Sequence, residues 1–386
     1  MLKVISFYLP QFHSIPENDA VWGKGFTEWD SVKSAKPLFD GHEQPRTPFK
    51  GEYYNLLNED TIYQQTQLAK KYNVFGFCIY HYWFSGKKLL NKPLEIIRDS
   101  EKINFPYCIC WANESWTDAW TATDKPKSFL KQEYGDKQEW KEHFDYLLTF
   151  FKDPNYILEN NKPMLVIYRP ENIPNLNEKL DFWSDLAKDN GFDGIQYAYQ
   201  QIEFEEDPNS DDSRFTYSIE YQPVYARRSI ENNSTNKQIG ALKKHAKSFL
   251  QGIKRKYDID LLKVRHEHLK KNAESVGPRV MDYAQVSEAM INLHGNGKKS
   301  AAGMFVGYDD TPRKGRRGLV IQSNAQNFRK YMFKQAQNVK KNYNNDYMFM
   351  FAWNEWGESG YLEPDEKSGY AYLEAVKDAV NDYESM

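Results

Sequence analysis

Residues 347–358 read YMFMFAWNEWGE, an apolar run that passes directly into two carboxylates. A short run rich in aromatic residues is typical of a buried strand. Glu355 and Glu358 then stand three residues apart, between tryptophans, just after that strand. Barrel enzymes built from alternating strands and helices place catalytic groups at this end of their strands. The stretch therefore predicts a parallel barrel and, at its edge, a candidate catalytic pair.

Similar apolar runs recur along the chain, with helix-like segments between them. Alternating strands and helices indicate a parallel sheet, and eight such units are the number that closes into a barrel. We predict an α/β fold, a (β/α)8 TIM barrel, formed by residues 1–386 as a single domain. The predicted strands are Val4–Pro10, Val74–Tyr82, Tyr107–Trp111, Met164–Arg169, Gly194–Tyr199, Tyr217–Tyr221, Gly303–Tyr308 and Tyr347–Trp353.

Two long loops interrupt this alternation, residues 10–58 after the first strand and residues 222–281 after the sixth. Because loops after strands build the active-site face of a barrel, we expect both to cover the cleft. The second loop belongs to a basic region, residues 226–299. This region fits either a solvated helical face or a contact with an anionic glycan or a membrane surface.

The bulk composition limits the possible partners. A formal net charge of -3 argues against a nucleic-acid-binding protein. No apolar stretch is long enough to span a bilayer, and the N-terminus lacks a secretory pattern, so we expect a cytoplasmic protein. Cys78, Cys108 and Cys110 lie in strand-like runs, which predicts buried thiols without a disulfide framework.

Aromatic residues make up 16% of the chain, and several tryptophans stand beside polar residues. Exposed aromatic rings beside hydrogen-bonding groups suit a carbohydrate, although a large aromatic core would give the same composition. Cleavage of a glycosidic bond commonly uses two carboxyl groups, the role predicted for Glu355 and Glu358. A solvated acidic loop is the alternative interpretation of these two residues.

A second constellation, Trp111-Ala112-Asn113-Glu114-Ser115-Trp116, follows the third strand. Glu114 could bind sugar hydroxyls, act as the acid itself, or be structural. Polar and aromatic residues also end the first and second strands, so we predict that they converge on one pocket. The predicted substrate-binding residues are Tyr8, Gln11, His13, Trp22, Lys24, Phe26, Glu28, Trp29, His81, Tyr82, Trp83, Trp111, Asn113, Glu114, Trp116, Tyr168, Arg169, Trp353, Asn354 and Trp356.

Three other motifs are poor candidates for metal or nucleotide sites. His266 and His268 lie two apart in a helix-like stretch and would face apart. Residues 295–300 lack the spacing of a phosphate loop. The acidic residues Asp258 and Asp260 do not stand at a strand end. We therefore expect no metal and no cofactor.

The chain resembles the WbsX-like proteins of bacterial lipopolysaccharide and capsule gene clusters, which are related to glycoside hydrolase family 99. The resemblance extends over nearly the whole chain. It is carried by FYLPQFHSIPENDAVWGKGFTEWDSV, KPLFDGHEQPRTP, GFCIYHYWFSGKKLLNKPLE, CWANESWT, GYDDTPR and FAWNEWGESGYLEPD.

The resemblance implies a (β/α)8 barrel and assigns both catalytic roles to the Asn-Glu-Trp-x-Glu segment. Glu355 would deprotonate the 2-hydroxyl of the sugar, which attacks C1 and gives a 1,2-anhydro intermediate. Glu358 would serve as the acid and then as the base. The related mannosidases have Gly-Thr-Gln after the second glutamate, whereas this chain has Ser359-Gly360-Tyr361, so mannose specificity is not carried over.

The resulting hypothesis is a retaining glycoside hydrolase that acts on a bacterial surface polysaccharide or oligosaccharide, free or lipid-linked. The alternatives are a glycosyltransferase or transglycosylase of O-antigen or capsule biosynthesis, and a non-catalytic glycan-binding barrel. A transferase that uses sugar nucleotides would need a phosphate loop or a metal-binding acid pair, and the sequence shows neither.

Overall fold

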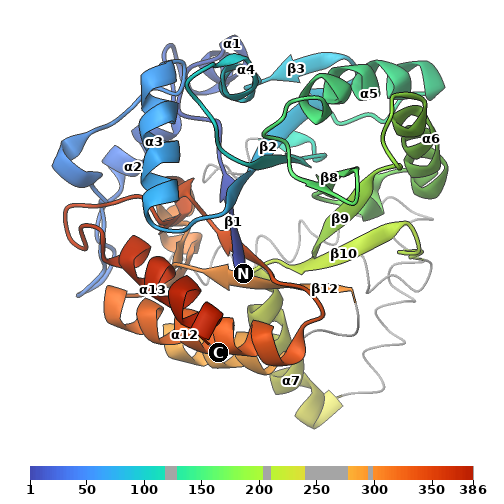
Figure 1. Ribbon diagram of the computed structural model, residues 1–386. Coiled ribbons are helices and arrows are strands. Elements are labelled where there is room, and N and C mark those ends of the chain that lie inside the picture. Colours follow the sequence, from blue (N-terminus) through green and yellow to red (C-terminus); the bar gives the residue numbers. More distant parts are fainter. Residues whose placement is uncertain (118–127, 203–209, 240–276, 294–298, 386) are drawn as a thin grey trace.

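The computed structural model describes residues 1–117, 128–202, 210–239, 277–293 and 299–385. Its central feature is a closed barrel in which each strand pairs in parallel with both neighbours, as predicted (Figure 1). Pairing of the first strand with the second closes the ring, so no strand edge is left unpaired. In order around the barrel the strands are β1 (Lys3–Tyr8), β2 (Gly76–Phe84), β4 (Tyr107–Trp111), β8 (Lys162–Ile167), β9 (Gln196–Gln201), β10 (Phe215–Glu220), β12 (Ser300–Phe305) and β15 (Tyr347–Phe351).

Helices surround the strands (Figure 1). An amphipathic helix buries its apolar face against its neighbours. In α5, for example, the buried residues include Trp140, Phe144 and Leu147, which recur at spacings of three and four. The helices are α3 (Glu59–Lys71), α4 (Lys92–Asp99), α5 (Lys137–Phe151), α6 (Leu176–Asp189), α7 (Val224–Ile239), α10 (Tyr283–Asn292), α12 (Ala325–Asn342) and α13 (Ala371–Ser385).

The loops between these elements contain short structures of their own, and several of them shape the site described below. The short helices are α1 (Pro16–Trp22), α2 (Glu28–Ser34) and α11 (Thr311–Lys314), with 3-10 turns η1 (Phe49–Gly51), η3 (Pro170–Asn172), η5 (Gly315–Arg317) and η6 (Trp356–Glu358). The short strands are β3 (Lys87–Leu89), β5 (Trp116–Thr117), β6 (Ser128–Leu130), β7 (Leu158–Glu159), β11 (Arg279–Val280), β13 (Tyr308–Asp309), β14 (Leu319–Ile321), β16 (Asn354–Glu355) and β17 (Gly360–Tyr361).

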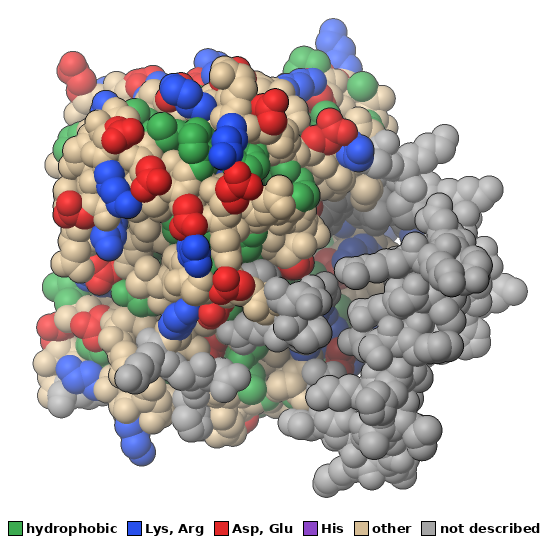
Figure 2. Space-filling model, turned by 90° about the vertical axis from the view of Figure 1, so that its right-hand side faces the viewer, with side chains coloured by type: hydrophobic (Ala, Val, Ile, Leu, Met, Phe, Trp, Pro, Cys, Tyr) green, Lys and Arg blue, Asp and Glu red, His purple; other side chains and the backbone are tan. Residues whose placement is uncertain are grey.

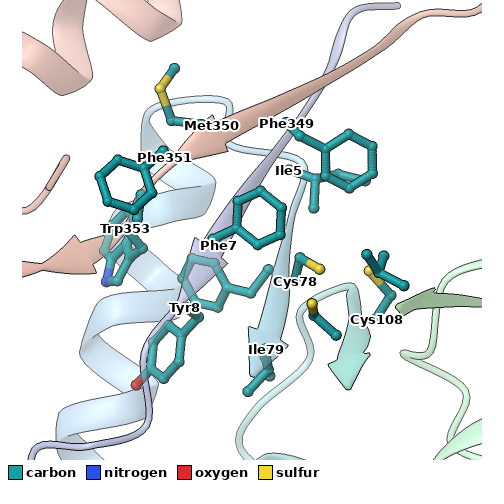
Figure 3. Packing of buried hydrophobic residues seen from close by; sticks show 14 of the residues in the cluster. Ile5, Phe7, Tyr8, Cys78, Ile79, Cys108, Phe349, Met350, Phe351 and Trp353 are labelled. Atoms are coloured by element: carbon teal, nitrogen blue, oxygen red, sulfur yellow. The ribbon is translucent and has the colours of Figure 1, made fainter. Parts of the chain in front are cut away.

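Aromatic side chains fill much of the barrel interior (Figure 3). The Phe7 ring stacks on Tyr80 with centroids 5.7 Å apart and meets Tyr221 edge-on at 5.5 Å. Such ring pairs stabilise the core beyond the area that they bury. The cysteines of β2 and β4 are buried and free, as the sequence predicts.

The loop of residues 10–58 is joined to the end of β15 by a side-chain amide. Asn354 accepts a hydrogen bond from the backbone N–H of Leu9 at 2.7 Å and donates one to the Leu9 carbonyl at 3.0 Å. This reciprocal pair fixes where the loop leaves the barrel. It places α1 and α2 beside the segment that carries the two glutamates, because the same Asn354 immediately precedes Glu355.

Most of the basic region 226–299 lies outside the described residues, as do Asp258, Asp260, His266 and His268 and all but the last two residues of the segment 295–300. On the face seen in Figure 2, basic and acidic side chains are interspersed over the described surface. Within the described parts of the chain, no helix is both long enough and apolar enough to cross a bilayer.

Candidate active site

A pocket of about 370 Å³ opens at the carboxyl ends of the barrel strands. Tyr80 and Tyr82 of β2, Tyr168 after β8 and Tyr221 after β10 contribute to its wall. A lining that combines aromatic rings with convergent polar groups is typical of small-molecule sites. Both predicted catalytic residues, Glu355 and Glu358, line this pocket. The pocket therefore lies where the sequence predicted an active site.

A tight hairpin presents the two glutamates. Asn354 and Glu355 of β16 pair in antiparallel fashion with Tyr361 and Gly360 of β17, and η6 forms the turn between them. Ser359 ends the turn in the left-handed conformation, with φ of 50°. The hairpin turns the chain back immediately after β15, so Glu355 and Glu358 stay at the mouth of the barrel.

The buried carboxylate of Glu363 anchors this hairpin from behind. It accepts the indole N–H of Trp356 at 2.7 Å and that of Trp353 at 3.1 Å. It also accepts hydrogen bonds from Tyr54 and Gln65, each at 2.7 Å. The two tryptophans on either side of Glu355 are thereby held against the barrel wall, away from the pocket.

One arginine bridges Glu355 and Glu358, the two predicted catalytic residues. Arg313 donates from Nη2 to Glu355 at 2.9 Å and from Nη1 to Glu358 at 2.9 Å. Its Nη2 and Nε atoms also lie 2.8 and 3.3 Å from one carboxylate oxygen of Glu28. All four side chains are largely buried, at 8–12% exposure. Charge-assisted hydrogen bonds in a desolvated setting are strong and directional.

Burial raises the pKa of Glu355 to about 8, because Arg313 only partly offsets desolvation while Glu358 and Glu28 raise it further. Burial also raises the pKa of Glu358, again with Arg313 opposing. Since the two carboxyls contact one guanidinium, they titrate as a pair rather than as two independent groups. A pair that holds one proton near neutral pH can donate a proton from one member and accept one at the other.

Glu114 lies in the same pocket but in different surroundings. Its side chain is 42% exposed, and it accepts a hydrogen bond from Nε of Arg169 at 3.2 Å. A partly exposed carboxyl group with oxygen atoms open to the pocket suits hydrogen bonding to the hydroxyl groups of a sugar. Of the three alternatives for Glu114, this geometry favours sugar binding.

An aromatic wall extends from the glutamates along one side of the pocket. Trp22 stacks on Phe26 with centroids 5.1 Å apart and meets Phe129 edge-on at 5.3 Å. Trp116 lies 5.2 Å from the Tyr82 ring, edge to face. Flat apolar surfaces of this kind match the C–H faces of sugar rings.

The structure brings together many of the predicted site residues, including members of the first long loop. That loop walls the pocket through α1 and α2, as expected. The predicted residues that line the pocket are Gln11, Trp22, Phe26, Glu28, Tyr82, Glu114, Trp116, Tyr168, Glu355 and Glu358.

Another group of predicted residues does not line the pocket. Most of these side chains are buried elsewhere, and a side chain without exposed surface cannot contact a substrate. Lys24 is exposed outside the lining, and Arg169 stands behind Glu114. The buried ones are Tyr8, His13, Trp29, His81, Trp83, Trp111, Asn113, Trp353, Asn354 and Trp356.

Strand alternation explains why several of these residues lie outside the pocket lining, because successive side chains point to opposite faces of a strand. Tyr80 and Tyr82 face the pocket, so His81 and Trp83 must face the helices. His81 there contacts His143 of α5, with Nε2 atoms 3.0 Å apart. Phe7 and Tyr8 likewise lie on opposite sides of β1, and Tyr8 donates to Gln65 of α3 at 2.7 Å (Figure 3).

Asn113 is a structural residue of the pocket rim. Its amide accepts from the backbone N–H of Arg169 at 2.8 Å and donates to the Arg169 carbonyl at 2.7 Å. This amide joins the loops after β4 and β8. Asn113 and Asn354 thus perform the same task, each fastening two neighbouring loops of the mouth.

Sequence reasoning missed Arg313, although it ends the segment GYDDTPR on which the family resemblance partly rests. Its partners Glu28, Glu355 and Glu358 lie far from it in the sequence, so no local pattern indicates its role. Tyr80 could have been found by alternation from Tyr82. Tyr221 could have been found because it follows the sixth strand directly, as Glu355 follows the eighth.

Comparisons with known proteins agree with this picture. A family model described as glycosyltransferase WbsX matches residues 4–376. The protein WxcX of Xanthomonas campestris pv. campestris, described as uncharacterized, is 30% identical over 380 residues, which are 98% of this chain and 49% of WxcX. The same protein from a second strain matches equally well. This chain spans about half the length of these curated relatives.

Solved structures share the fold. The GH99 endo-alpha-mannosidase from Bacteroides thetaiotaomicron superposes with a TM-score of 0.54 at 14% identity, covering 99% of this chain and 97% of that chain. A glycoside hydrolase-like protein gives a TM-score of 0.54 at 12% identity, covering 98% and 93%. At such identities the likeness concerns the fold, and the chemistry has to be argued from the pocket.

Proposed function

This chain belongs to the WbsX glycosyltransferase family, and from that premise and the pocket we propose that residues 1–386 form one catalytic domain that cleaves glycosidic bonds with retention of configuration. The substrate that we propose is a bacterial surface polysaccharide or oligosaccharide. The observation that carries the proposal is the buried carboxyl pair, Glu355 and Glu358, held by Arg313 at the mouth of the barrel. A glycan-binding protein without catalysis has no need of such a pair.

In the proposed reaction, Glu355 takes the proton of the sugar 2-hydroxyl while that oxygen attacks C1. The C1–O bond to the leaving group breaks, and Glu358 gives its proton to the departing oxygen. The 1,2-anhydro ring then opens when Glu358 takes a proton from water, whose oxygen attacks C1, and the proton on Glu355 returns to O2. Two inversions at C1 give net retention. Attack within one molecule benefits from high effective molarity.

Transfer to a sugar hydroxyl is the second candidate. It would use the same intermediate, with an acceptor hydroxyl in place of water. The observation in its favour is the aromatic wall of Trp22, Phe26, Phe129 and Trp116, which offers space for a sugar beyond the reacting ring.

The deciding experiment incubates the protein with the surface polysaccharide of the producing organism and follows new reducing ends. NMR of the first product formed gives its anomeric configuration. Added oligosaccharide acceptors that gain sugars without new reducing ends would identify transfer. One control is the double variant in which Glu355→Gln and Glu358→Gln are combined, which should be inactive. The other is Glu374→Gln, a change at an exposed residue, which should match the wild type. Binding of the glycan without turnover would overturn the catalytic proposal.

A further inference from the structure

Arg313 and Glu28 form an ion pair that reaches the two catalytic glutamates from different loops. We propose that this pair sets the protonation state of Glu355 and Glu358, with Arg313 lowering and Glu28 raising the pH at which the pair titrates. The inference rests on the proposed function, since it assigns positioning residues to that same site.

The geometry is a shared guanidinium. Nη1 of Arg313 serves Glu358, whereas Nη2 lies 2.9 Å from Glu355 and 2.8 Å from Glu28. Glu28 and Glu355 therefore share one nitrogen, which has two N–H groups and can donate to both carboxylates. A planar guanidinium can hold two carboxylates at once, which the single ammonium of lysine cannot do in the same geometry. Arg313 thus fixes the two glutamates relative to one another.

The charges at this point do not balance. Three carboxylates, Glu28, Glu355 and Glu358, face one guanidinium, so with all groups ionised the cluster would carry two negative charges. The other charged groups nearby do not correct this, because Lys314 donates to Asp310 at 2.6 Å. The phenols of Tyr82, Tyr168, Tyr221 and Tyr308 also lie near the pair, and Glu114 lines the same pocket. One proton shared by Glu355 and Glu358 would reduce this excess of negative charge.

The absence of a side chain at Gly357 leaves room for the contact between Arg313 and Glu28. A Cβ atom on residue 357 would lie 2.8 Å from Nη2 of Arg313 and 2.8 Å from the Glu28 carboxylate. Gly357, one of the two residues between Glu355 and Glu358, therefore has no side chain where the ion pair passes. Glu28 is the first residue of α2 and is itself only 8% exposed, so it cannot turn away into solvent.

Arg313 is poorly placed to bind an anionic substrate instead. Its Nε, Nη1 and Nη2 atoms all face carboxylates of this chain. A substrate carboxylate or phosphate would have to replace one of them and would meet the repulsion of the others. We therefore assign Arg313 to the control of Glu355 and Glu358 rather than to substrate binding.

Opposite effects follow for two variants. Glu28→Gln leaves Arg313 to the catalytic pair alone, so the acidic limb of the pH profile of kcat/KM should move down by about one pH unit. Arg313→Gln removes the stabilising charge, so the same limb should move up by at least about one unit. Arg313→Lys keeps a charge but cannot bridge both carboxylates, and its limb should lie between those of Arg313→Gln and the wild type.

The test measures kcat/KM from pH 4 to 9 on a glycoside with an activated leaving group. In parallel, NMR of protein labelled with ¹³C at the glutamate side-chain carboxyl follows the titration itself, with Glu355→Gln used to assign the signal. Arg316→Gln is the matched control, since Arg316 is exposed and lies three residues along the same segment. It should leave both readouts unchanged.

Shifts in the same direction for Glu28→Gln and Arg313→Gln, or no shift in either, would overturn the inference. So would an equal shift in Arg316→Gln. If Arg313→Gln does not fold, Arg313→Lys replaces it. A wild type without glycosidase activity would count against the proposed function, whereas the carboxyl titration would still test the ion pair.

Discussion

Arg313 passes so close to Gly357 that a Cβ atom there would lie 2.8 Å from the Nη2 atom of the guanidinium. Carbon and nitrogen atoms that are not bonded do not approach so closely. A glycine at position 357 therefore leaves the space that Arg313 needs to bridge Glu355 and Glu358.

Gly357→Ala should displace the guanidinium and break its contact with at least one glutamate. We expect kcat/KM to fall by roughly 10- to 100-fold, because small displacements of catalytic groups are costly to rate. The fold should persist, since the strain concerns one side chain at the pocket. Kinetics together with thermal unfolding test this. Wild-type activity in the variant would show that the bridge is dispensable.

The two glutamates should respond differently to the leaving group. Glu358→Gln should be severely slow on glycosides with poor leaving groups and nearly normal on activated ones, because an activated group needs little protonation. Glu355→Gln should be slow on both, by about 10²- to 10⁴-fold. A 2-deoxy substrate should be almost inert. Ready turnover of the 2-deoxy sugar would contradict the 1,2-anhydro route.

Replacement of Glu363 by Gln should weaken the support behind the hairpin. Burial raises the pKa of Glu363 to about 7 although four donors point at it. A glutamine would present an N–H group to some of these donors and leave buried partners unsatisfied, at about 1–3 kcal/mol each. We expect a lower Tm and a reduced kcat, measured by calorimetry and kinetics. An unchanged Tm would show that the indoles of Trp353 and Trp356 are held by packing alone.

The buried His81 and His143 should make the fold sensitive to acid. Burial lowers the pKa of His81 to about 3 and that of His143 well below its ordinary value. Both histidines are thus neutral in the folded state and protonate more readily when unfolded. The contribution of the two neutral histidines to the free energy of unfolding is therefore fully present above pH 6.5. It is lost progressively as the pH falls from 6.5 toward 3.

His143→Phe keeps a ring against Trp83, which stacks on His143 at 4.5 Å. Its unfolding free energy should fall less between pH 7 and pH 5 than that of the wild type, by up to about 2 kcal/mol. Urea unfolding at pH 7, 6 and 5 measures the difference. Equal pH slopes in the two proteins would assign the acid sensitivity to other groups.

Much of the fold could be predicted from local sequence. Each of the eight predicted strands is present in the barrel, because a buried parallel strand reads as a short apolar run whatever its neighbours are. The glutamates after β15 could be predicted for the same reason, since their chemistry and their strand-end position are both local properties. Strand alternation, taken residue by residue, also predicts that His81 and Tyr8 point away from the pocket.

The sequence by itself thus determined the barrel and the position of two carboxyl groups just after its last strand. Only the tertiary structure decided which charges surround them. Arg313 and Glu28 are 285 positions apart, and Arg313 and Glu355 are 42 apart, so no local pattern links them. They meet because closure of the barrel brings the loops after β1, β12 and β15 to one mouth, where burial makes each charge depend on its neighbours.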